Sequence, residues 1–320
     1  MDGAPSDQMQ PVAADPAVLE LVDSFCESFA TERRLSEHTV RAYHADLTAF
    51  AVWCHGKSVD PTAAGVRTLR RYLADLSAAG YERTTINRHL SSLRSFYRWL
   101  IVQGVVADDP AGALMGPKKD RSLPAVIGPS DMAALLSVHG PRDRLGRPRK
   151  QDARDIRDQA LLEFLYACGV RVSEASGLLL ANVDFRRGSV KVFGKGSKER
   201  IVPLHPMALA AMERYRDQAR DELLVQGPVA YFFVSNRGGR YTTDAIRKMF
   251  KRTVREAGLD ESLSPHAMRH TFATDVLGGG ADLRSVQEML GHASLSTTQI
   301  YTHVEAERLK AVHSQACPRA

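Results

Sequence analysis

The sequence predicts a mainly α-helical protein of two domains, the second of which also carries a small antiparallel sheet. The chain has 320 residues, more than one average hydrophobic core serves, so two domains are expected. Apolar residues recur at helical spacing through most of the chain. A Gly-rich turn separates the short apolar segments 190–193 and 199–202, a pattern typical of a β-hairpin.

The composition indicates an ordinary globular protein with a basic balance. Hydrophobic residues make up 44%, charged residues 25%, and the formal net charge is +6. Arg outnumbers Lys among the 43 basic residues, which suits phosphate binding, although a GC-rich genome gives the same bias. The four Cys residues are scattered and predict reduced thiols, with no metal site and no cofactor. Neither a signal peptide nor an apolar run of roughly 20 residues is evident, so we expect a cytoplasmic protein without a membrane partner.

The N-terminal third predicts a helical domain. Residues 1–16 lack Lys, Arg and periodicity, and we expect a disordered leader. Residues 17–110 contain four amphipathic patterns, at about 18–30, from Ser36 to 51, at 66–79 and from 84 to a stop at Gly104. Residues 111–128 mix Gly, Pro and basic residues without a period, so they predict a linker.

Basic residues on the fourth helix and in the linker are candidates for contact with a DNA backbone. A solvated charged face and a simple tether are the alternatives, and base rates favour them. The candidate residues are Arg83, Arg88, Arg94, Arg98, Lys118, Lys119 and Arg121.

Residues 129–320 predict a second, larger domain. A helix is expected at 130–138, followed by a basic surface loop over 139–157 and a helix at 156–167. The hairpin comes next, and a short strand is expected at 231–234. The remainder of the domain is mostly helical in its pattern.

Several residues of the second domain could carry chemistry on phosphate. His266 and Arg269 lie three residues apart after Pro265, so both project from one face of a helix. Arg can hold two phosphate oxygens while His transfers a proton. Taken alone, such a pair is more often an ordinary surface feature, and lone Tyr or His residues are usually structural.

Five segments together resemble the tyrosine recombinase (phage integrase) family, and more closely its Xer group. They are GVRVSE around Arg171, GKGSKERIVPL around Lys195, SPHAMRHTFAT around His266 and Arg269, GGGADLRSVQEMLGH ending at His292, and TTQIYTHV around Tyr301. The resemblance covers about residues 17–320. Cys317 departs from the pattern, because related chains often have His there.

The resemblance implies both a fold and a mechanism. Residues 17–110 would form a SAM-like core-binding domain, and residues 129–320 an α+β catalytic domain of the DNA breaking-rejoining type. Tyr301 would attack the scissile phosphate and leave a 3′-phosphotyrosyl link, without metal or ATP.

The resemblance also implies roles for the supporting residues. Arg171 and Arg269 would clamp the phosphate oxygens, and Lys195 would protonate the leaving group. His266 would relay a proton, and His292 would donate a hydrogen bond to the phosphate. Glu174 is expected to orient Arg171 or cap its helix rather than to act as a base.

The resemblance also implies partners. These are double-stranded DNA, identical or paralogous protomers in a tetramer on two DNA sites, and a septal DNA translocase. The corresponding task is resolution of chromosome dimers at cell division. Three alternatives stay open: a mobile-element integrase or transposase, a type IB topoisomerase, and a DNA-binding regulator without catalysis. The complete set of candidate residues disfavours the last, because a binder has no use for the tyrosine.

Overall fold

The chain folds into two compact units. The computed structural model describes residues 14–33, 37–118, 126–142, 146–194, 199–225 and 227–291. The division falls between Arg121 and Ser122, inside the segment expected to be a linker. The expected fold class, helical in the first unit and helical with a small antiparallel sheet in the second, is confirmed.

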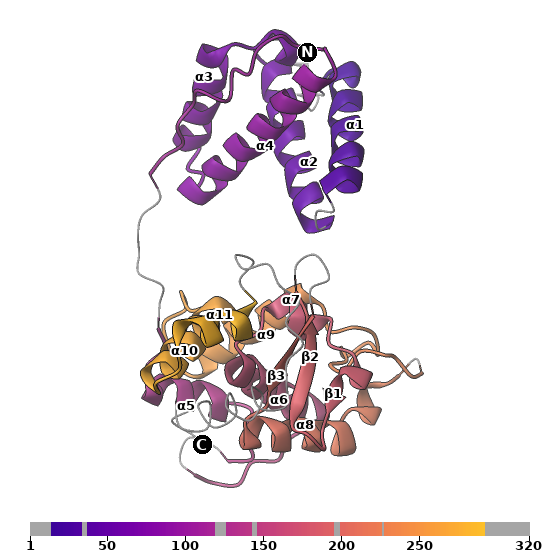
Figure 1. Cartoon of the computed structure of the whole chain (residues 1–320), viewed down its shortest axis with the longest axis vertical. Coiled ribbons are helices and arrows are strands. Elements are labelled where there is room, and N and C mark those ends of the chain that lie inside the picture. The colour runs from indigo at the N-terminus through magenta and orange to yellow at the C-terminus, as the bar shows by residue number, and fades with distance from the viewer. Residues whose placement is uncertain are drawn as a thin grey trace, which may run out of the picture. The chain divides into compact units, whose positions relative to one another are not determined.

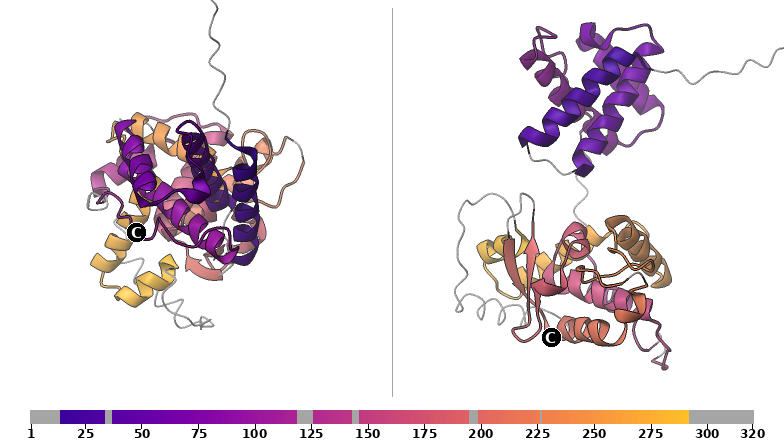
Figure 2. Two further views of the ribbon diagram at one scale, coloured as in Figure 1. Left: turned by 90° about the horizontal axis from the view of Figure 1, so that it is seen from above. Right: turned by 90° about the vertical axis from the view of Figure 1, so that its right-hand side faces the viewer.

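The N-terminal unit consists of four α-helices around an aromatic core (Figures 1 and 2). They are α1 (Pro16–Arg33), α2 (Glu37–His55), α3 (Val66–Ala78) and α4 (Arg83–Val102), with the short 3₁₀ helix η1 (Pro61–Ala63) between α2 and α3. Phe25 of α1, Phe50 of α2 and Phe96 of α4 are buried where these helices pack against one another. Ala111 and Leu114, within the expected linker, are also buried in this core.

Helix α6 (Ala153–Cys168) forms the centre of the C-terminal unit. Its residues from Ala160 to Cys168 are buried in succession, so every face of the helix packs against protein. Helices α5 (Pro129–Ser137), α8 (Pro206–Gln218) and α10 (Pro265–Gly278) pack around it. At sixteen residues α6 is about 24 Å long, and its two ends therefore serve separate regions of the unit.

The three-stranded antiparallel sheet has the order β1 (Val183–Asp184), β2 (Ser189–Phe193) and β3 (Glu199–Pro203). Strands β2 and β3 form the expected hairpin, with Val190 opposite Val202. Burial alternates along β2, and along β3 as far as Val202, as expected for a sheet with one packed face; Pro203 at the end of β3 is buried as well. On β3 the buried positions hold Arg200 and Val202, whereas Ile201 is exposed.

The remaining helices are α7 (Val172–Ser176), α9 (Thr243–Glu256) and α11 (Leu283–Leu290), with the 3₁₀ helices η2 (Leu180–Asn182) and η4 (Asp221–Leu223). Helix α7 packs on α9 and β2, and α11 packs on α10 and β3. These elements therefore gather at one end of the unit (Figure 1).

The expected strand at 231–234 is wrong. The segment makes only isolated bridges, from Tyr231 to Leu179 and from Val234 to Arg240. The guanidinium of the buried Arg220 donates to the carbonyls of Val229, Tyr231 and Phe232. These carbonyls bind a side chain, and among the described residues the segment forms no regular ladder with a neighbouring strand.

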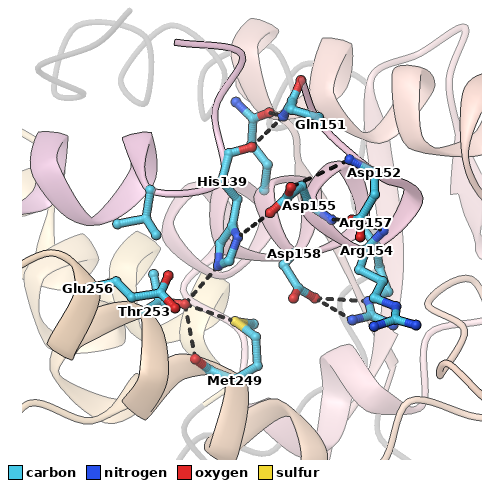
Figure 3. A network of polar contacts seen from close by, with 12 residues as sticks. His139, Gln151, Asp152, Arg154, Asp155, Arg157, Asp158, Met249, Thr253 and Glu256 are labelled. Atoms are coloured by element: carbon cyan, nitrogen blue, oxygen red, sulfur yellow. Dashed lines mark hydrogen bonds and ion pairs between the residues drawn. The ribbon is translucent and has the colours of Figure 1, made fainter. Parts of the chain in front are cut away.

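A buried group of polar residues joins the end of α5 to α6 and α9 (Figure 3). His139 lies 3.0 Å from an oxygen of Asp155 and 2.9 Å from the hydroxyl of Thr253. Next to them Arg157, 2% exposed, bonds its neighbour Asp158, 1% exposed, and the carbonyl of Val234. We call these five residues, His139, Asp155, Arg157, Asp158 and Thr253, the histidine network.

Two absences hold for the described part of the chain alone. None of its helices has the length and apolar character needed to cross a membrane. It also contains no group of three or more His, Cys, Asp or Glu side chains arranged to hold a metal ion.

Candidate active site

Arg171 lies where α6 turns into α7. Gly169 ends α6 in the left-handed conformation, at φ 53°, and Arg171 is the N-cap of α7. The backbone N–H of Arg171 donates to Oε2 of Glu174 at 2.8 Å, and its Nη1 donates to Oε1 at 2.9 Å. The Arg171 side chain remains 37% exposed, whereas that of Glu174 is 2% exposed. The expected structural role of Glu174, orienting Arg171 and capping its helix, is confirmed.

A second arginine completes the environment of Glu174. Arg200 on β3 forms a fork with the carboxylate, with Nη1 to Oε1 at 2.9 Å and Nη2 to Oε2 at 2.8 Å. Burial raises the pKa of Glu174, but the hydrogen bonds and charge of Arg200, together with Arg171, outweigh it and hold the pKa below its ordinary value. Glu174 is therefore an ionised acceptor and is unsuited to act as a base near neutral pH.

Arg269 lies in the first turns of α10 and reaches both α6 and α11. Its guanidinium donates to the carbonyl of Gly169 and to the carbonyl of Leu290. Removal from water and the charge of Arg171 lower the pKa of Arg269 to about 10. Removal from water is the larger of these two causes, and the charge of Arg171 is the one that a bound anion would offset.

His266, one turn earlier on α10, is exposed at the same end of the unit. Partial removal from water, followed by the charges of Arg247 and Arg269, lowers its pKa from the ordinary value. The imidazole is therefore neutral at pH 7. In this state it can accept a proton, as a base or relay requires.

These residues form a cationic site with a surplus of charge. We call Arg171, Arg200, Arg269 and Glu174 the arginine cluster. It holds three guanidinium groups against one carboxylate within the described residues. Arg171 uses only Nη1 on Glu174, so its other donors point to no acceptor among the described residues. The cluster can therefore hold the oxygens of a phosphate.

The expected catalytic residues are only partly within the described chain. Arg171 and Arg269 lie close enough to His266 to lower its pKa, and Arg171 also lowers the pKa of Arg269, so the structure brings these three residues together. Lys195, His292 and Tyr301 lie outside the described residues.

Arg200 was not expected from the sequence. A signal for it was present, because the two-residue period of a strand places Arg200 on the same face as Val202. An arginine on the inward face of a strand needs a buried partner.

The expected DNA-binding residues of α4 have internal partners in the structure. Arg88 pairs with the buried Asp46 and the carbonyl of Ala42, and Arg94 donates to the carbonyls of Ala111 and Leu114. Arg98 lies 3.7 Å from Asp109 and is largely exposed. Arg83 and Lys118 are exposed as well. Lys119 and Arg121 lie outside the described residues.

Family models match both units of the chain. Residues 144–308 match the model of the phage integrase family, and residues 22–104 match the model described as phage integrase, N-terminal SAM-like domain. The chain therefore belongs to the phage integrase family of tyrosine-type site-specific recombinases.

Curated relatives cover nearly the whole chain. It is similar to tyrosine recombinase XerD of Pseudomonas aeruginosa, with 41% identity over 299 residues, 93% of this chain and 97% of the relative. It is also similar to tyrosine recombinase XerD of Yersinia pestis, with 40% identity over 94% of this chain and 98% of the relative. The similarity thus extends through both units.

Solved structures of low sequence identity share the fold. A XerH site-specific recombinase bound to a palindromic difH substrate, in a post-cleavage complex, has a TM-score of 0.71 at 19% identity, covering 97% of this chain and 98% of that one. A lambda integrase tetramer bound to a Holliday junction has a TM-score of 0.63 at 14% identity, covering 91% of this chain and 76% of that one. At these identities the likeness concerns the fold.

Proposed function

We propose that this recombinase cleaves and rejoins DNA through a covalent link between Tyr301 and a 3′-phosphate. The observation that carries the proposal is the surplus of positive charge around Arg171 and Arg269, one turn from a neutral His266. This arrangement suits a phosphodiester that gains negative charge as a fifth oxygen bonds to phosphorus.

The proposed step exchanges one phosphodiester bond for another. The Tyr301 oxygen bonds to phosphorus, and the bond from phosphorus to the 5′-oxygen breaks. Tyr has a free pKa near 10, so it requires a proton acceptor, which we assign to His266. Lys195 donates a proton to the leaving 5′-oxygen, and His292 donates a hydrogen bond to the phosphate. A second strand's 5′-hydroxyl reverses the step without ATP, because the phosphotyrosyl link retains the energy of the phosphodiester.

We propose the following division of labour between the segments. Residues 17–110 bind DNA as a core-binding domain, and residues 129–320 carry the chemistry. Arg83, Arg98 and Lys118 lie at exposed positions suited to phosphate, and Arg88 and Arg94 donate to a buried carboxylate and to backbone carbonyls respectively. Replacing Arg83, Arg98 and Lys118 together with Ala should flatten the dependence of log affinity on log salt, by up to about 0.9 for each phosphate that the variant leaves without a cation.

The cellular task that we propose is resolution of chromosome dimers in the cytoplasm. Support comes from the relatives named XerD, which match over nearly the whole chain. In this proposal four protomers, identical or paralogous, assemble on two DNA sites and respond to a septal DNA translocase. The tetrameric lambda integrase on a Holliday junction supports the expectation of a tetramer by its shared fold.

A suicide substrate tests the central proposal. Nicked duplexes from the replication-terminus region of the host chromosome lose a short fragment after cleavage, which traps the covalent complex. The native chain should give a protein–DNA band on a denaturing gel, and Tyr301→Phe should bind the same DNA without giving the band. A covalent band from Tyr301→Phe would assign the nucleophile to another residue.

A further inference from the structure

Arg200 is a buried arginine, and each of its three side-chain nitrogens donates a hydrogen bond inside the protein. It is 7% exposed, on the inward face of β3. Nη1 and Nη2 bind the two oxygens of Glu174, and Nε donates to the carbonyl of Met289 at 2.7 Å. Because the guanidinium is buried and each of its nitrogens is already bonded, we expect Arg200 to affect the reaction through its partners rather than by binding a phosphate.

Arg200 and its partners lie on three segments that are distant in the sequence. Glu174 lies 26 residues away on α7, and Met289 lies 89 residues away at the carboxyl end of α11. Strand β3 itself begins four residues after Lys195, and Met289 precedes His292 by three residues. Arg200 thus ties together the ends of three segments that carry proposed catalytic residues.

The Glu174 carboxylate is saturated only when Arg200 is present. Oε1 accepts from Nη1 of Arg171 and Nη1 of Arg200, and Oε2 accepts from the backbone N–H of Arg171 and Nη2 of Arg200. Without Arg200, Glu174 would have only Arg171 as a partner within the cluster. The carboxylate would then be free to turn and bind Arg171 with both oxygens, which would occupy the donors that a phosphate needs.

Stability alone does not explain an arginine at this position. A buried ion pair is often no more stabilising than well-packed apolar side chains of similar volume, because both charges lose their hydration. What the fork of an arginine adds is geometry, since two parallel hydrogen bonds fix the plane of the carboxylate. Arg200 also packs closely against the end of α11. Gly291, which directly follows α11, is in the left-handed conformation, and a Cβ at this position would lie 3.1 Å from Nη1 of Arg200.

We propose that Arg200 is a positioning residue for strand cleavage. It holds Glu174 in the orientation that leaves Arg171 open to the phosphate, and it fixes the end of α11 that leads to His292. This inference rests on the proposed function. A displacement of about 1 Å at a reacting group can cost about 10²-fold in rate, so the loss of Arg200 is expected to act at that scale.

The test compares Arg200→Gln with a matched control, Arg157→Gln. Arg157 is also a buried arginine bound to a carboxylate and to a backbone carbonyl, but it lies near the amino end of α6. Both variants should lose similar stability. The rate of covalent complex formation at saturating protein should fall about 10²-fold in Arg200→Gln and stay within about threefold in Arg157→Gln, while DNA affinity changes little in either.

Two further measurements identify the residues through which Arg200 affects the rate of cleavage. Glu174→Gln combined with Arg200→Gln should be little slower than the slower single variant, because the two residues act as one unit. A substrate with a 5′-bridging sulfur, whose leaving group needs no proton, should not restore the rate of Arg200→Gln. Restoration by sulfur would show that Arg200 acts on leaving-group protonation and would overturn the path through Glu174 and Arg171.

The outcomes separate this inference from the function on which it rests. If the native chain forms no covalent complex with any terminus duplex, the proposed function fails. If it does and Arg200→Gln cleaves at the native rate, or slows no more than Arg157→Gln, the positioning role is wrong and the function stands. Should Arg200→Gln fail to fold, Arg200→Lys keeps the charge but loses the fork, and it should still lose about tenfold or more in rate at saturating protein. A native rate for Arg200→Lys would equally overturn the role.

Discussion

The two ends of helix α6 carry buried arginine–carboxylate groups that differ in charge balance and in access. At the amino end, the histidine network pairs Arg157 with Asp158, and His139 with Asp155. At the carboxyl end, the arginine cluster sets three arginines against Glu174. Arg157 is 2% exposed, but Arg171 is 37% exposed.

This difference separates a structural group from a reactive one. In the histidine network each buried charge meets an opposite charge or a backbone carbonyl, and Asp155 and Asp158 are also contacted by Arg149 and Arg252. In the arginine cluster, removal from water and then repulsion by the charge of Arg171 lower the pKa of Arg269. The presence of buried ion pairs thus says little about function, whereas an uncompensated and accessible surplus indicates where an anion binds.

The largest expected effect follows from removing the proposed proton donor, Lys195. It tests whether Lys195 acts at the same site as the arginine cluster at the carboxyl end of α6. Lys195 precedes β3 by four residues, and β3 carries Arg200 of the cluster. Lys195→Ala should slow cleavage about 10²–10⁴-fold, as expected for loss of a general acid. A 5′-bridging sulfur should restore most of the rate, which single-turnover gels can measure. Without such restoration the acid would have to be sought at another residue.

Next in size is removal of the exposed arginine of the cluster. Arg171→Ala should reduce the cleavage rate by about 10²–10³-fold, because one of the groups that stabilise the developing charge is lost. Affinity for DNA, which depends on many phosphate contacts, should change by less than tenfold. Filter binding and single-turnover cleavage measure the two quantities. A loss confined to affinity would contradict the assigned role.

The converse experiment removes an arginine from the histidine network. Arg157→Gln should destabilise the C-terminal unit by about 3–5 kcal/mol, because the buried Asp158 loses its closest cation and keeps only the longer contacts with Arg252 and the Tyr241 hydroxyl. Urea unfolding gives the free energy of unfolding. The cleavage rate of the folded protein should remain near native. A loss of cleavage rate of more than tenfold, at a temperature where the variant is folded, would show that the histidine network is not purely structural.

The smallest expected effect concerns pH. Since the folded-state pKa of His266 lies below its ordinary value, the unfolded chain takes up this proton at a higher pH than the folded chain. Stability should therefore fall as pH drops below about 6.5, the ordinary histidine pKa, until it passes the folded-state pKa. His266→Gln should reduce this slope in urea titrations between pH 7 and pH 5. The exposed position of the ring keeps the effect smaller than that of Arg157→Gln.

The parts of the molecule that local patterns determine were predictable. The helices of the N-terminal unit and the hairpin follow from periodicities of 3.6 and 2 and from a Gly-rich turn. The segment 231–234 misled because a short apolar run predicts burial but not a strand partner. Its carbonyls bind Arg220, an interaction that no local pattern reveals.

The candidate site was predictable only where a motif carries it. Arg171, His266 and Arg269 were expected, and the structure brings them together. Arg200 was missed because its role depends on Glu174 and Met289, which only the tertiary fold brings within reach. The assignments of Lys195, His292 and Tyr301 stay predictions.

The turn at Gly169 has a consequence for how this chain can evolve. A Cβ at this position would lie 2.3 Å from Cδ1 of Phe272, and φ of 53° already disfavours any side chain. The two positions are therefore epistatic: a change at 169 becomes tolerable only after the ring at 272 has been replaced by a smaller group. The Gly169 carbonyl also accepts a hydrogen bond from the Arg269 guanidinium. A substitution that shifts the backbone at 169 would disturb this bond, so few substitutions should be tolerated there. In a library that randomises both positions, we expect survivors with a side chain at 169 to carry a reduced side chain at 272.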